Sequence, residues 1–571
     1  INAKIQKFVY FCQLVRNLIY MNINSVNKKL EASFKENWWK LALSNYQGET
    51  MNYAMMAERI EMMHVIFQRC GLKPGDRVAI CGRNQANWGV CFLAAMTYGA
   101  VPVPILHEFN PDSIIYLLGH SESRVFFVDE TVWAQLDSKN LPDLEVVVNI
   151  SDLQCLMSVK DDIDAIRMDV VMEFRRKYPC GLRPEQICYY EDKPDELAII
   201  NYTSGTSGFS KGVMIPYRAI ACNMYFAAHV AEPQMDSNSK IVSMLPLAHM
   251  YGLMFEFLFE ISIGAHVYFL TKTPSPKVIM SAFAEIHPSV IIAVPLIIEK
   301  VYKTQLKPVA EKLKFFFAAP FIGGIVRKYM KKRVIAAFGG EFEEVILGGA
   351  AVNPEVEKFF HRLHFPFTVG YGMTECAPII TYVKWNKAKV GSSGKVVPGC
   401  KIRVDSPDPA KIPGEVQVCG QNVFLGYYKN EEATKEVFTQ DGWFRTGDMG
   451  IIKNGYLYLK GRCKCMILSA NGQNIYPEEL EAVINNFPYV VESLVVEDKG
   501  GLTAIVYPDY AASRMYGISK EDIEGKLQSM LPEVNKALPN YAQIRKIEFI
   551  ENDFERTPKR NIKRYLYQKN K

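Results

Sequence analysis

A loop rich in glycine and hydroxyl groups, YTSGTSGFSKGVM at residues 202–214, is the stretch whose residue types most directly suggest chemistry. Glycine lets a backbone approach a ligand closely, and exposed N–H groups and hydroxyls suit phosphate oxygens. Lys211 adds a positive charge at the end of the loop. Because a flexible linker uses the same residue types, the loop by itself indicates either phosphate binding or a plain connection.

Two common interpretations of such a loop fail on its own residues. Lys211 is followed by Gly212 and not by Ser or Thr, which excludes the P-loop of nucleoside triphosphatases. GFSKG at residues 208–212 matches the G-x-S-x-G pattern of hydrolases. A nucleophile elbow, however, needs its serine on a sharp turn directly after a strand. Ser210 lies well beyond the apolar strand LAIINY, inside the loop, so a hydrolase is disfavoured.

Three later stretches carry side chains that suit the other parts of a nucleotide. In VGYGMTECAP, Tyr371 could stack on a base, Thr374 could bond a phosphate and Glu375 could bind Mg²⁺. In DGWFRTGDMG, Asp448 could accept the hydroxyls of a ribose, and Arg462 follows a later strand. Taken singly, an ordinary structural role is favoured for each: a core aromatic for Tyr371, a turn carboxylate for Asp448 and a surface ion pair for Arg462.

The elements that must position these residues indicate an α/β fold. Helical and short apolar segments alternate from NYAMMAERIEMMHVIFQRCGL through DRVAICG, NWGVCFLAAMTYGA and VPVPIL, and apolar strands recur up to EVILGGA. Such runs suit largely parallel sheets that are covered on both faces. We expect a large N-terminal domain of layered, mostly parallel sheets with helices, ending in a small antiparallel β-unit formed by short alternating strands after residue 391. A small α+β C-terminal domain follows, with helices at 478–486 and 520–538 around a hairpin.

We place the domain boundary near Arg462, which divides the chain into domains 21–461 and 462–571. Residues 1–20 are apolar and aromatic but interrupted by Arg16, too short and too charged for a transmembrane span. We expect them to be a non-native extension, with a membrane-surface segment as the alternative. The 13 cysteines show no framework spacing, and the net charge of +5 is too small to indicate a nucleic acid partner. We therefore expect reduced thiols and a cytoplasmic protein.

In this order, the stretches YTSGTSGFSKGV, LPLAHMYG, ILGGAA, GYGMTE, GWFRTGD and GRCKCMILSANGQNIYPEELE are specific. The chain resembles the adenylate-forming superfamily of acyl-CoA synthetases, luciferases and adenylation domains, over residues 33–566. Within it, the chain looks most like bacterial long-chain fatty acid CoA ligases (AMP-forming). The resemblance implies activation of a fatty acid with ATP and Mg²⁺, then transfer to coenzyme A with release of AMP and pyrophosphate. The C-terminal domain would be mobile and rotate between the two steps.

The resemblance also assigns roles to residues of this chain. The loop would bind the β- and γ-phosphates of ATP through Thr203, Ser204, Gly205, Thr206, Ser207, Gly208 and Lys211. The adenine would lie on the turn Gly348, Gly349 and Ala350, against the segment Tyr371, Gly372, Met373 and Thr374. Asp448 and Arg462 would hold the ribose, Thr206 and Glu375 would bind Mg²⁺, and Thr374 would contact the α-phosphate. His249 would lie between the acyl pocket and the adenylate, although a packed core histidine fits the same sequence.

The chain departs from the family's pattern at three places. Ser210 stands where the family has proline, and Cys465 replaces the aspartate of the Gly-Arg-x-Lys-Asp hinge. The catalytic lysine of the family follows a glycine near the C-terminus, but FERTPKRNIKRYLY contains none. Lys559 is our first choice and Lys563 the second, with Asn561 at that position as a further alignment. If both lysines lay on a solvated tail, adenylation chemistry would be in doubt.

A basic segment at residues 303–333 bears on the substrate. It holds nine basic residues and one acid, Glu311, around the apolar FFFAAPFIGGIV. The resemblance associates such an insert with long-chain synthetases, and it could contact an anionic membrane surface; a basic helix pair with an ordinary buried face is the alternative. Two other functions remain open: an enzyme that activates an aryl or amino acid or loads a carrier protein, and a catalytically inactive binding protein. An amino-acid substrate would need a nearby acid, for which Glu256 and Glu260 are the candidates.

Overall fold

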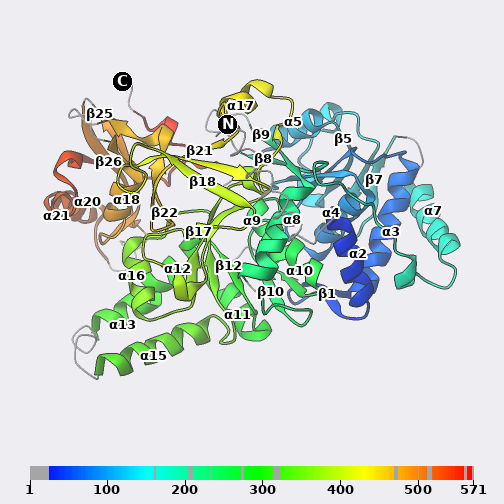
Figure 1. Ribbon diagram of the computed structural model, residues 1–571, viewed down its shortest axis with the longest axis horizontal. Coiled ribbons are helices and arrows are strands. Elements are labelled where there is room, and N and C mark those ends of the chain that lie inside the picture. The colour runs from blue at the N-terminus through cyan, green and yellow to red at the C-terminus, as the bar shows by residue number, and fades with distance from the viewer. Residues whose placement is uncertain are drawn as a thin grey trace, which may run out of the picture.

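A computed structural model describes residues 25–159, 163–203, 210–231, 233–271, 275–312, 322–468, 474–498, 500–510, 517–557 and 562–568. The chain forms a large N-terminal α/β domain and a smaller C-terminal domain, which lies at the upper left of Figure 1. The α/β fold class expected from the sequence is confirmed. The sheets are of mixed type, with helices packed against them.

The first sheet has five strands in the order β4-β3-β5-β6-β7, of which only β7 is antiparallel to its neighbour. On β3, Val78 and Ile80 face one hydrophobic core, and Ala79 and Cys81 face another. Because successive side chains of a strand point to opposite faces, a continuously apolar strand fits a sheet covered on both sides. The strands are β3 (Arg77–Cys81), β4 (Val101–Ile105), β5 (Ser123–Val128), β6 (Val146–Asn149) and β7 (Cys155–Ser158). The helices of this region are α2 (Val26–Glu36), α3 (Tyr53–Arg69), α4 (Ala86–Tyr98), α5 (Pro111–Ser121), α6 (Glu130–Trp133) and α7 (Ile163–Lys177).

Two further sheets are also mainly parallel. One has the order β10-β11-β1-β2, with only β2 antiparallel, and the other has the order β12-β13-β14. Their strands are β1 (Leu41–Asn45), β2 (Thr50–Asn52), β10 (Lys240–Ser243), β11 (His266–Phe269), β12 (Ile291–Ala293), β13 (Val345–Leu347) and β14 (Phe367–Val369). The helices are α8 (Tyr217–Phe226), α9 (Met250–Leu253), α10 (Phe259–Ile263), α11 (Pro276–Ile286), α12 (Pro295–Val301), α13 (Lys307–Lys312), α15 (Ile322–Ala337) and α16 (Pro354–Arg362). A π-helical turn, η4 (Met254–Leu258), joins α9 to α10.

The glycine-rich loop does not lie in a parallel sheet. It connects β8 (Leu197–Thr203) to β9 (Lys211–Pro216), which pair antiparallel, and β20 (Gly426–Tyr427) pairs with the other side of β9. The connection is too short for the crossover that a parallel pair requires. This antiparallel sheet therefore stands beside the mainly parallel sheets of the same domain.

The remaining strands of the N-terminal domain are antiparallel, as expected after residue 391. They form the sheets β15-β16-β17 and β18-β19-β21-β22. Their bounds are β15 (Tyr371–Gly372), β16 (Ile379–Tyr382), β17 (Lys395–Val396), β18 (Cys400–Asp405), β19 (Gly414–Gly420), β21 (Phe444–Lys453) and β22 (Tyr456–Arg462), with the short helix α17 (Glu431–Glu436).

The C-terminal domain packs helices against a three-stranded sheet in the order β25-β26-β27. The single helix predicted for residues 520–538 is instead two, α20 (Lys520–Ser529) and α21 (Leu531–Ala537). Pro532 lies in the first turn of α21, where a proline is tolerated, whereas inside one long helix it would break a hydrogen bond. The other elements are β23 (Ile467–Leu468), β24 (Asn474–Ile475), α18 (Pro477–Ile484), β25 (Val490–Asp498), β26 (Gly501–Pro508) and β27 (Ile544–Phe549).

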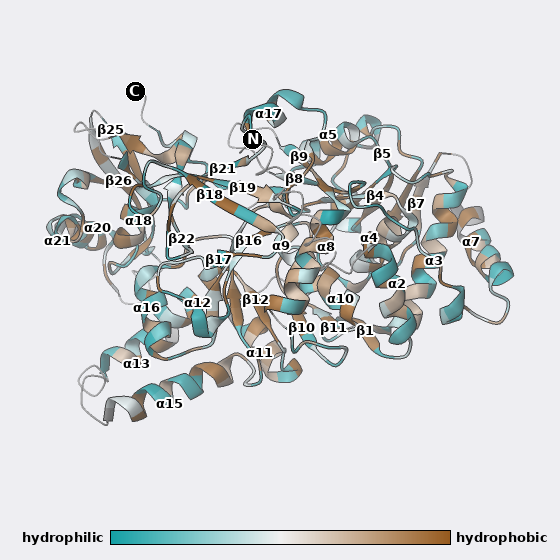
Figure 2. Cartoon of the chain, viewed as in Figure 1, coloured by the Kyte–Doolittle hydropathy of each residue, from teal (hydrophilic) through white to brown (hydrophobic). Residues whose placement is uncertain are grey.

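Helices α13 and α15 extend from the body of the protein at the lower left of Figure 1. In Figure 2, α15 carries hydrophilic and hydrophobic residues along its length. Its exposed side chains include Ile325 and Tyr329, at 70% and 55% of their full accessibility. Within the described residues, no helix combines the length and the apolar character that a membrane span requires.

Candidate active site

A cavity of about 1330 Å³ brings together most of the predicted site residues that the structure describes. Its walls come from the hairpin β8–β9, the helix that begins at α9, the turn after β13, strand β15 and the chain that follows β22. The predicted residues on its lining are Thr203, Lys211, His249, Gly348, Gly349, Ala350, Tyr371, Gly372, Met373, Thr374, Glu375 and Arg462. Segments far apart in the sequence thus meet at one site.

The hairpin places both ends of the glycine-rich loop at this cavity. Thr203 and Lys211 lie opposite each other in the register of β8 and β9, and the Thr203 hydroxyl lies 3.5 Å from the Lys211 carbonyl oxygen. Ser204, Gly205, Thr206, Ser207 and Gly208, predicted to bind phosphate, lie outside the described residues.

Lys211 and Glu375 are linked by a side chain that sequence reasoning missed, Tyr427. The Lys211 ammonium lies 4.8 Å from the centre of the Tyr427 ring, within the range of a cation–π interaction. The Tyr427 hydroxyl donates to Glu375 Oε1 at 3.0 Å. Burial, and then the nearby Glu375 charge, raises the pKa of Tyr427 and keeps its hydroxyl protonated as a donor. Tyr427 therefore orients the carboxylate that we predicted to bind Mg²⁺.

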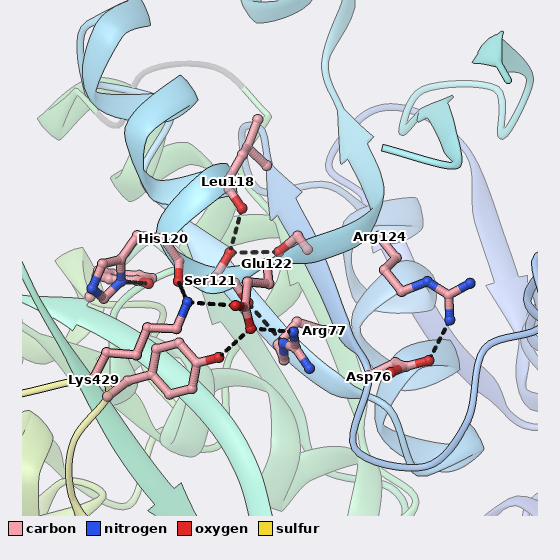
Figure 3. Close-up of polar contacts among 11 residues, drawn as sticks. Asp76, Arg77, Leu118, His120, Ser121, Glu122, Arg124 and Lys429 are labelled. Carbon is pink, nitrogen blue, oxygen red and sulfur yellow. Dashed lines mark hydrogen bonds and ion pairs between the residues drawn. The ribbon is translucent and has the colours of Figure 1, made fainter. Parts of the chain in front are cut away.

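The segment after Tyr427 is anchored to the five-stranded sheet by a polar network (Figure 3). Glu122, which follows α5, accepts the Lys429 ammonium at 2.8 Å, Arg77 at 2.8 Å and the Tyr428 hydroxyl at 3.1 Å. Lys429 also donates to the carbonyl oxygen of His120 at 3.1 Å. The side chain of His120 in turn bonds the Tyr202 hydroxyl at the base of the loop, at 2.7 Å. This network holds the two segments that carry Tyr427 and Lys211 in a fixed relation.

A second carboxylate, Asp448, holds the two side chains predicted to surround adenine and ribose. The Tyr371 hydroxyl donates to Asp448 Oδ2 at 2.7 Å, and Arg462 Nε lies 3.1 Å from Asp448 Oδ1. Asp448 and Arg462 are opposite each other in β21 and β22, which explains how residues 14 positions apart meet. Burial and the Asp448 charge both raise the pKa of Tyr371, and the Asp448 charge raises that of Arg462. Tyr371 and Arg462 line the cavity, with Asp448 directly behind them.

The turn after β13 needs glycine at position 348, because the backbone there passes close to the ring of Tyr251. A Cβ atom on Gly348 would lie 2.9 Å from the ring of Tyr251, whose hydroxyl donates to the Ile346 carbonyl oxygen at 3.0 Å. Gly349 adopts a positive φ of 83°, a conformation that glycine accepts readily. Backbone, with no side chain in the way, therefore faces the cavity at the predicted adenine site.

His249 begins the helix that forms another wall. Its backbone is extended, the chain enters α9 at Met250, and the residue lines the cavity next to Tyr251. That His249 lies between an acyl pocket and an adenylate stays a prediction.

The apolar part was not identified from the sequence. It is lined by Phe226, Met244, Phe255, Phe259, Ile279 and Ile292, among others. In the sequence these residues belong to ordinary apolar runs, which predict core packing equally well. Nothing in a single sequence distinguishes a side chain that faces a cavity from one that faces another side chain.

Neither candidate lysine of the C-terminal tail is among the described residues that line the cavity. Lys559 lies outside the described residues. Lys563 lies 3.4 Å from the Glu555 carboxylate and is not part of the cavity lining. Its neighbour Arg564 pairs with the buried Glu481 of α18, which ties this part of the tail to the C-terminal domain.

Models of known protein families match most of the chain. The family model for AMP-binding enzymes matches residues 30–428, and that for the AMP-binding enzyme C-terminal domain matches residues 465–570. The chain is 27% identical to the long-chain-fatty-acid–CoA ligase FadD15 of Mycobacterium bovis, over 86% of each chain. It is 27% identical to the human long-chain-fatty-acid–CoA ligase ACSBG2, over 80% of this chain and 72% of that one. With long-chain-fatty-acid–CoA ligase 1 of Saccharomyces cerevisiae it shares 25% identity, over 86% and 77%.

Among solved structures, ATP-bound MatB from Rhodopseudomonas palustris superimposes with a TM-score of 0.73 at 24% identity, over 95% of this chain and 98% of that one. The o-succinylbenzoate CoA synthetase MenE from Bacillus subtilis, in complex with its acyl-adenylate, gives a TM-score of 0.72 at 21% identity, over 95% and 98%. These likenesses concern the fold. Since the family model covers most of the chain and the cavity gathers the motifs expected for it, this protein belongs to the AMP-binding enzyme family.

Proposed function

We propose that the enzyme activates a long-chain fatty acid with ATP and then transfers the acyl group to coenzyme A. The observation that carries the proposal is one continuous cavity with two chemically different parts. The part around Lys211, Glu375, Tyr371 and Arg462 suits a nucleotide, and the part around Phe255 and Phe259 suits a hydrocarbon chain. The relatives from Mycobacterium bovis, human and Saccharomyces cerevisiae are called long-chain-fatty-acid–CoA ligases, which supports this substrate and this acceptor.

The donor set of the polar part fits ATP and Mg²⁺. Tyr371 supplies an aromatic side chain beside the open backbone of the Gly348–Gly349 turn, and Arg462 supplies guanidinium donors near Asp448. Glu375 is a buried carboxylate held by Tyr427, and together with the proposed ligand Thr206 it would bind Mg²⁺. Bound Mg²⁺ supplies positive charge that offsets the charge of the phosphates.

In the first step a carboxylate oxygen of the fatty acid attacks the α-phosphorus of ATP. The bond between the α-phosphorus and the bridging oxygen breaks, which gives acyl-adenylate and pyrophosphate. Lys211 stabilises negative charge on the phosphates, and Thr374 contacts the α-phosphate. Positioning and charge stabilisation of this kind supply most of the rate in phosphoryl chemistry. In the second step the thiol of coenzyme A attacks the acyl carbon, and AMP leaves.

We place the boundary between the domains at residues 461 and 462, with rotation about Lys464 and Cys465 between the two steps. Hinges need residues that tolerate a change of dihedral angles more than one particular side chain, so the cysteine at 465 is compatible with rotation. Arg462, Cys463, Lys464 and Cys465 all line the cavity in the present arrangement. Rotation would bring a lysine of the tail, Lys559 or Lys563, to the adenylation site.

We also propose that residues 303–333 contact an anionic membrane surface on the cytoplasmic side. Helix α15 exposes Ile325 and Tyr329 beside Arg327, Lys328, Lys332 and Arg333. Aromatic and aliphatic groups among cations are the combination by which helices bind anionic bilayers. Residues 313–321, which hold most of FFFAAPFIGGIV, lie outside the described residues.

The proposal is tested by AMP release from ATP, Mg²⁺ and saturated acids of graded length, with and without coenzyme A. We expect release that requires coenzyme A and rises toward long chains. Turnover only with a carrier protein or with aryl or amino acids would favour the alternative enzyme on this fold. Absence of pyrophosphate exchange with every acid would favour an inactive binding protein. Lys559→Ala and Lys563→Ala in the same exchange assay identify the adenylation lysine.

A further inference from the structure

The wall of the apolar part of the cavity contains one buried carboxyl group, that of Glu260. Its residue is 1% exposed and lines the cavity beside Phe255 and Phe259. Its Oε2 atom is buried and makes no hydrogen bond with any described residue. Buried polar groups without a partner are rare in proteins because they lose their hydration and receive nothing in exchange.

The position of Glu260 along its helix places it deep in the cavity. The helix runs continuously from α9 through η4 into α10, with His249 at its N-terminal end. Tyr251, Phe255 and Phe259 line the cavity at intervals of four residues, as one face of a helix does. At 1.5 Å per residue, Glu260 lies roughly 15 Å along the axis from the His249 end. It would face the far part of a bound acyl chain, away from the reacting carboxylate.

Glu256, the neighbouring acid on the same helix, accepts hydrogen bonds from the protein itself. Oε2 of Glu256, one turn earlier, accepts the Ser243 hydroxyl at 3.1 Å and the backbone N–H groups of Met244 and Leu245 at 3.1 and 3.0 Å. Oε1 of Glu256 is also buried without a partner, but Glu256 is not part of the cavity lining. Glu256 therefore fastens the helix to the end of β10, whereas Oε2 of Glu260 accepts no hydrogen bond from a described residue.

The nearby Tyr53 hydroxyl donates its hydrogen bond elsewhere. The Glu260 charge is one cause of the raised pKa of Tyr53, after burial, so the two groups lie near each other. The Tyr53 hydroxyl, however, donates to the Ala265 carbonyl oxygen at 2.9 Å. Oε2 of Glu260 therefore has no hydrogen-bond partner among the described residues, and the residue lines the cavity.

The protonation state of Glu260 indicates which kind of group it would bind. Burial raises its pKa to about 8, so the carboxyl is mainly neutral at pH 7. A neutral carboxylic acid offers one O–H donor and an acceptor oxygen. This suits a neutral polar group, such as a hydroxyl, and gives no strong preference for a cation.

We propose that Glu260 forms a subsite for a hydroxyl group on the distal part of the acyl chain, so that the enzyme prefers hydroxylated long-chain fatty acids to unsubstituted ones. The inference rests on the proposed function and adds the substrate subclass. An unsubstituted chain leaves Glu260 without a partner, and a hydroxyl in reach supplies one. Sites built to bond a hydroxyl discriminate strongly against the analogue that lacks it.

The test uses sixteen-carbon acids with a hydroxyl at successive positions, the unsubstituted acid, and an acid with a terminal amine. Relative kcat/KM comes from coenzyme A-dependent AMP release, and relative affinity comes from calorimetry of each acid without turnover. We expect about a tenfold or greater preference for a distal hydroxyl over none, and no preference for a hydroxyl near the carboxylate. We expect Glu260→Leu to abolish that preference and the isosteric Glu260→Gln, which keeps a donor and an acceptor, to retain part of it. Glu256→Gln is the matched control and is expected to leave it unchanged.

Equal kcat/KM and affinity for hydroxylated and unsubstituted acids would overturn the subsite while leaving the proposed function intact. The same holds for a preference that survives Glu260→Leu, or for a stronger preference for the terminal amine. If no acid of any kind yields AMP, the proposed function fails, and the calorimetric comparison still decides whether Glu260 recognises a hydroxyl.

Discussion

The buried carboxyl groups of the two parts of the cavity differ in their hydrogen bonding. In the polar part, Asp448 bonds Tyr371 and Arg462, and Glu375 bonds Tyr427. In the apolar part, Oε2 of Glu260 has no hydrogen-bond partner among the described residues. Charged ligands are best bound by groups that are already oriented, because no reorganisation is then needed in the reaction. A polar group left unpaired in apolar surroundings instead discriminates between ligands by whether they satisfy it.

The largest effect on activity should follow from loss of Asp448, the carboxylate that bonds two side chains of the polar part. Asp448→Ala removes the acceptor of both the Tyr371 hydroxyl and the Arg462 guanidinium. We expect the rate of ATP–pyrophosphate exchange to fall about 100-fold, or about 3 kcal/mol, as for a lost charged hydrogen bond. Asp441→Ala is the control, since Asp441 pairs with Arg403 on the surface and exposed pairs contribute little. Similar rates for the two variants would show that Asp448 does not organise the site.

The unpartnered carboxyl should reveal itself in the pH dependence of stability. In the unfolded chain Glu260 loses its proton near pH 4.5, and in the folded protein near pH 8. Between these values the folded state binds one more proton, so the free energy of unfolding falls as pH rises, by about 1.4 kcal/mol per pH unit. From pH 6 to pH 7.5, the wild type should therefore lose about 2 kcal/mol more than Glu260→Gln.

Denaturant unfolding of both proteins across this pH range measures that difference directly. Contributions from titrating groups that do not interact with Glu260 cancel in the comparison. Parallel pH profiles would mean that the Glu260 carboxyl titrates normally in the folded protein and is not desolvated.

A smaller effect is expected from the bond that orients Glu375. Tyr427→Phe removes the hydroxyl that donates to Glu375 but keeps the ring beside Lys211. We expect about a fivefold loss of exchange rate, or about 1 kcal/mol, together with a higher Mg²⁺ requirement. Tyr510→Phe loses a bond to Glu524 of the C-terminal domain, away from the cavity lining, and serves as the control. An unchanged Mg²⁺ dependence in Tyr427→Phe would argue against Glu375 as a metal ligand.

The smallest effect is expected where the loop departs from the family's pattern. Ser210 precedes β9, so Ser210→Pro removes no hydrogen bond of the β8–β9 ladder, and activity should stay within about twofold. Lys211→Ala, one residue further, should slow adenylation clearly more. Equal losses in the two variants would mean that the phosphates contact the other end of the loop.

Much of the fold could be predicted because its signals are local. The continuous apolar strands, the helix of α3 and the antiparallel strands after residue 391 all follow from periodicity within short windows. Other features of the fold depend on how two strands pair or on a single residue. The antiparallel pairing of β8 with β9 depends on the length of the connection, and the break between α20 and α21 depends on Pro532.

The residues of the candidate site also fall into those with a local sequence signal and those without one. Lys211, Tyr371, Glu375 and Arg462 stand in short stretches with distinctive residue types, and the structure places all four on one cavity. Tyr427 follows a common Leu-Gly pair, and Phe255 lies in an apolar run, so neither has a local signal. Their roles depend on what lies opposite them.

By itself, the sequence determined the α/β class, the order of the motifs and the identity of the polar side chains, because these depend on residue types and short spacings. Only the tertiary structure decided that Asp448 bonds Tyr371, that Tyr427 connects Lys211 to Glu375, and that Oε2 of Glu260 has no hydrogen-bond partner among the described residues. Whether a buried group is satisfied depends on atoms brought together from distant parts of the chain. A linear pattern records which groups exist, and the fold determines which of them meet.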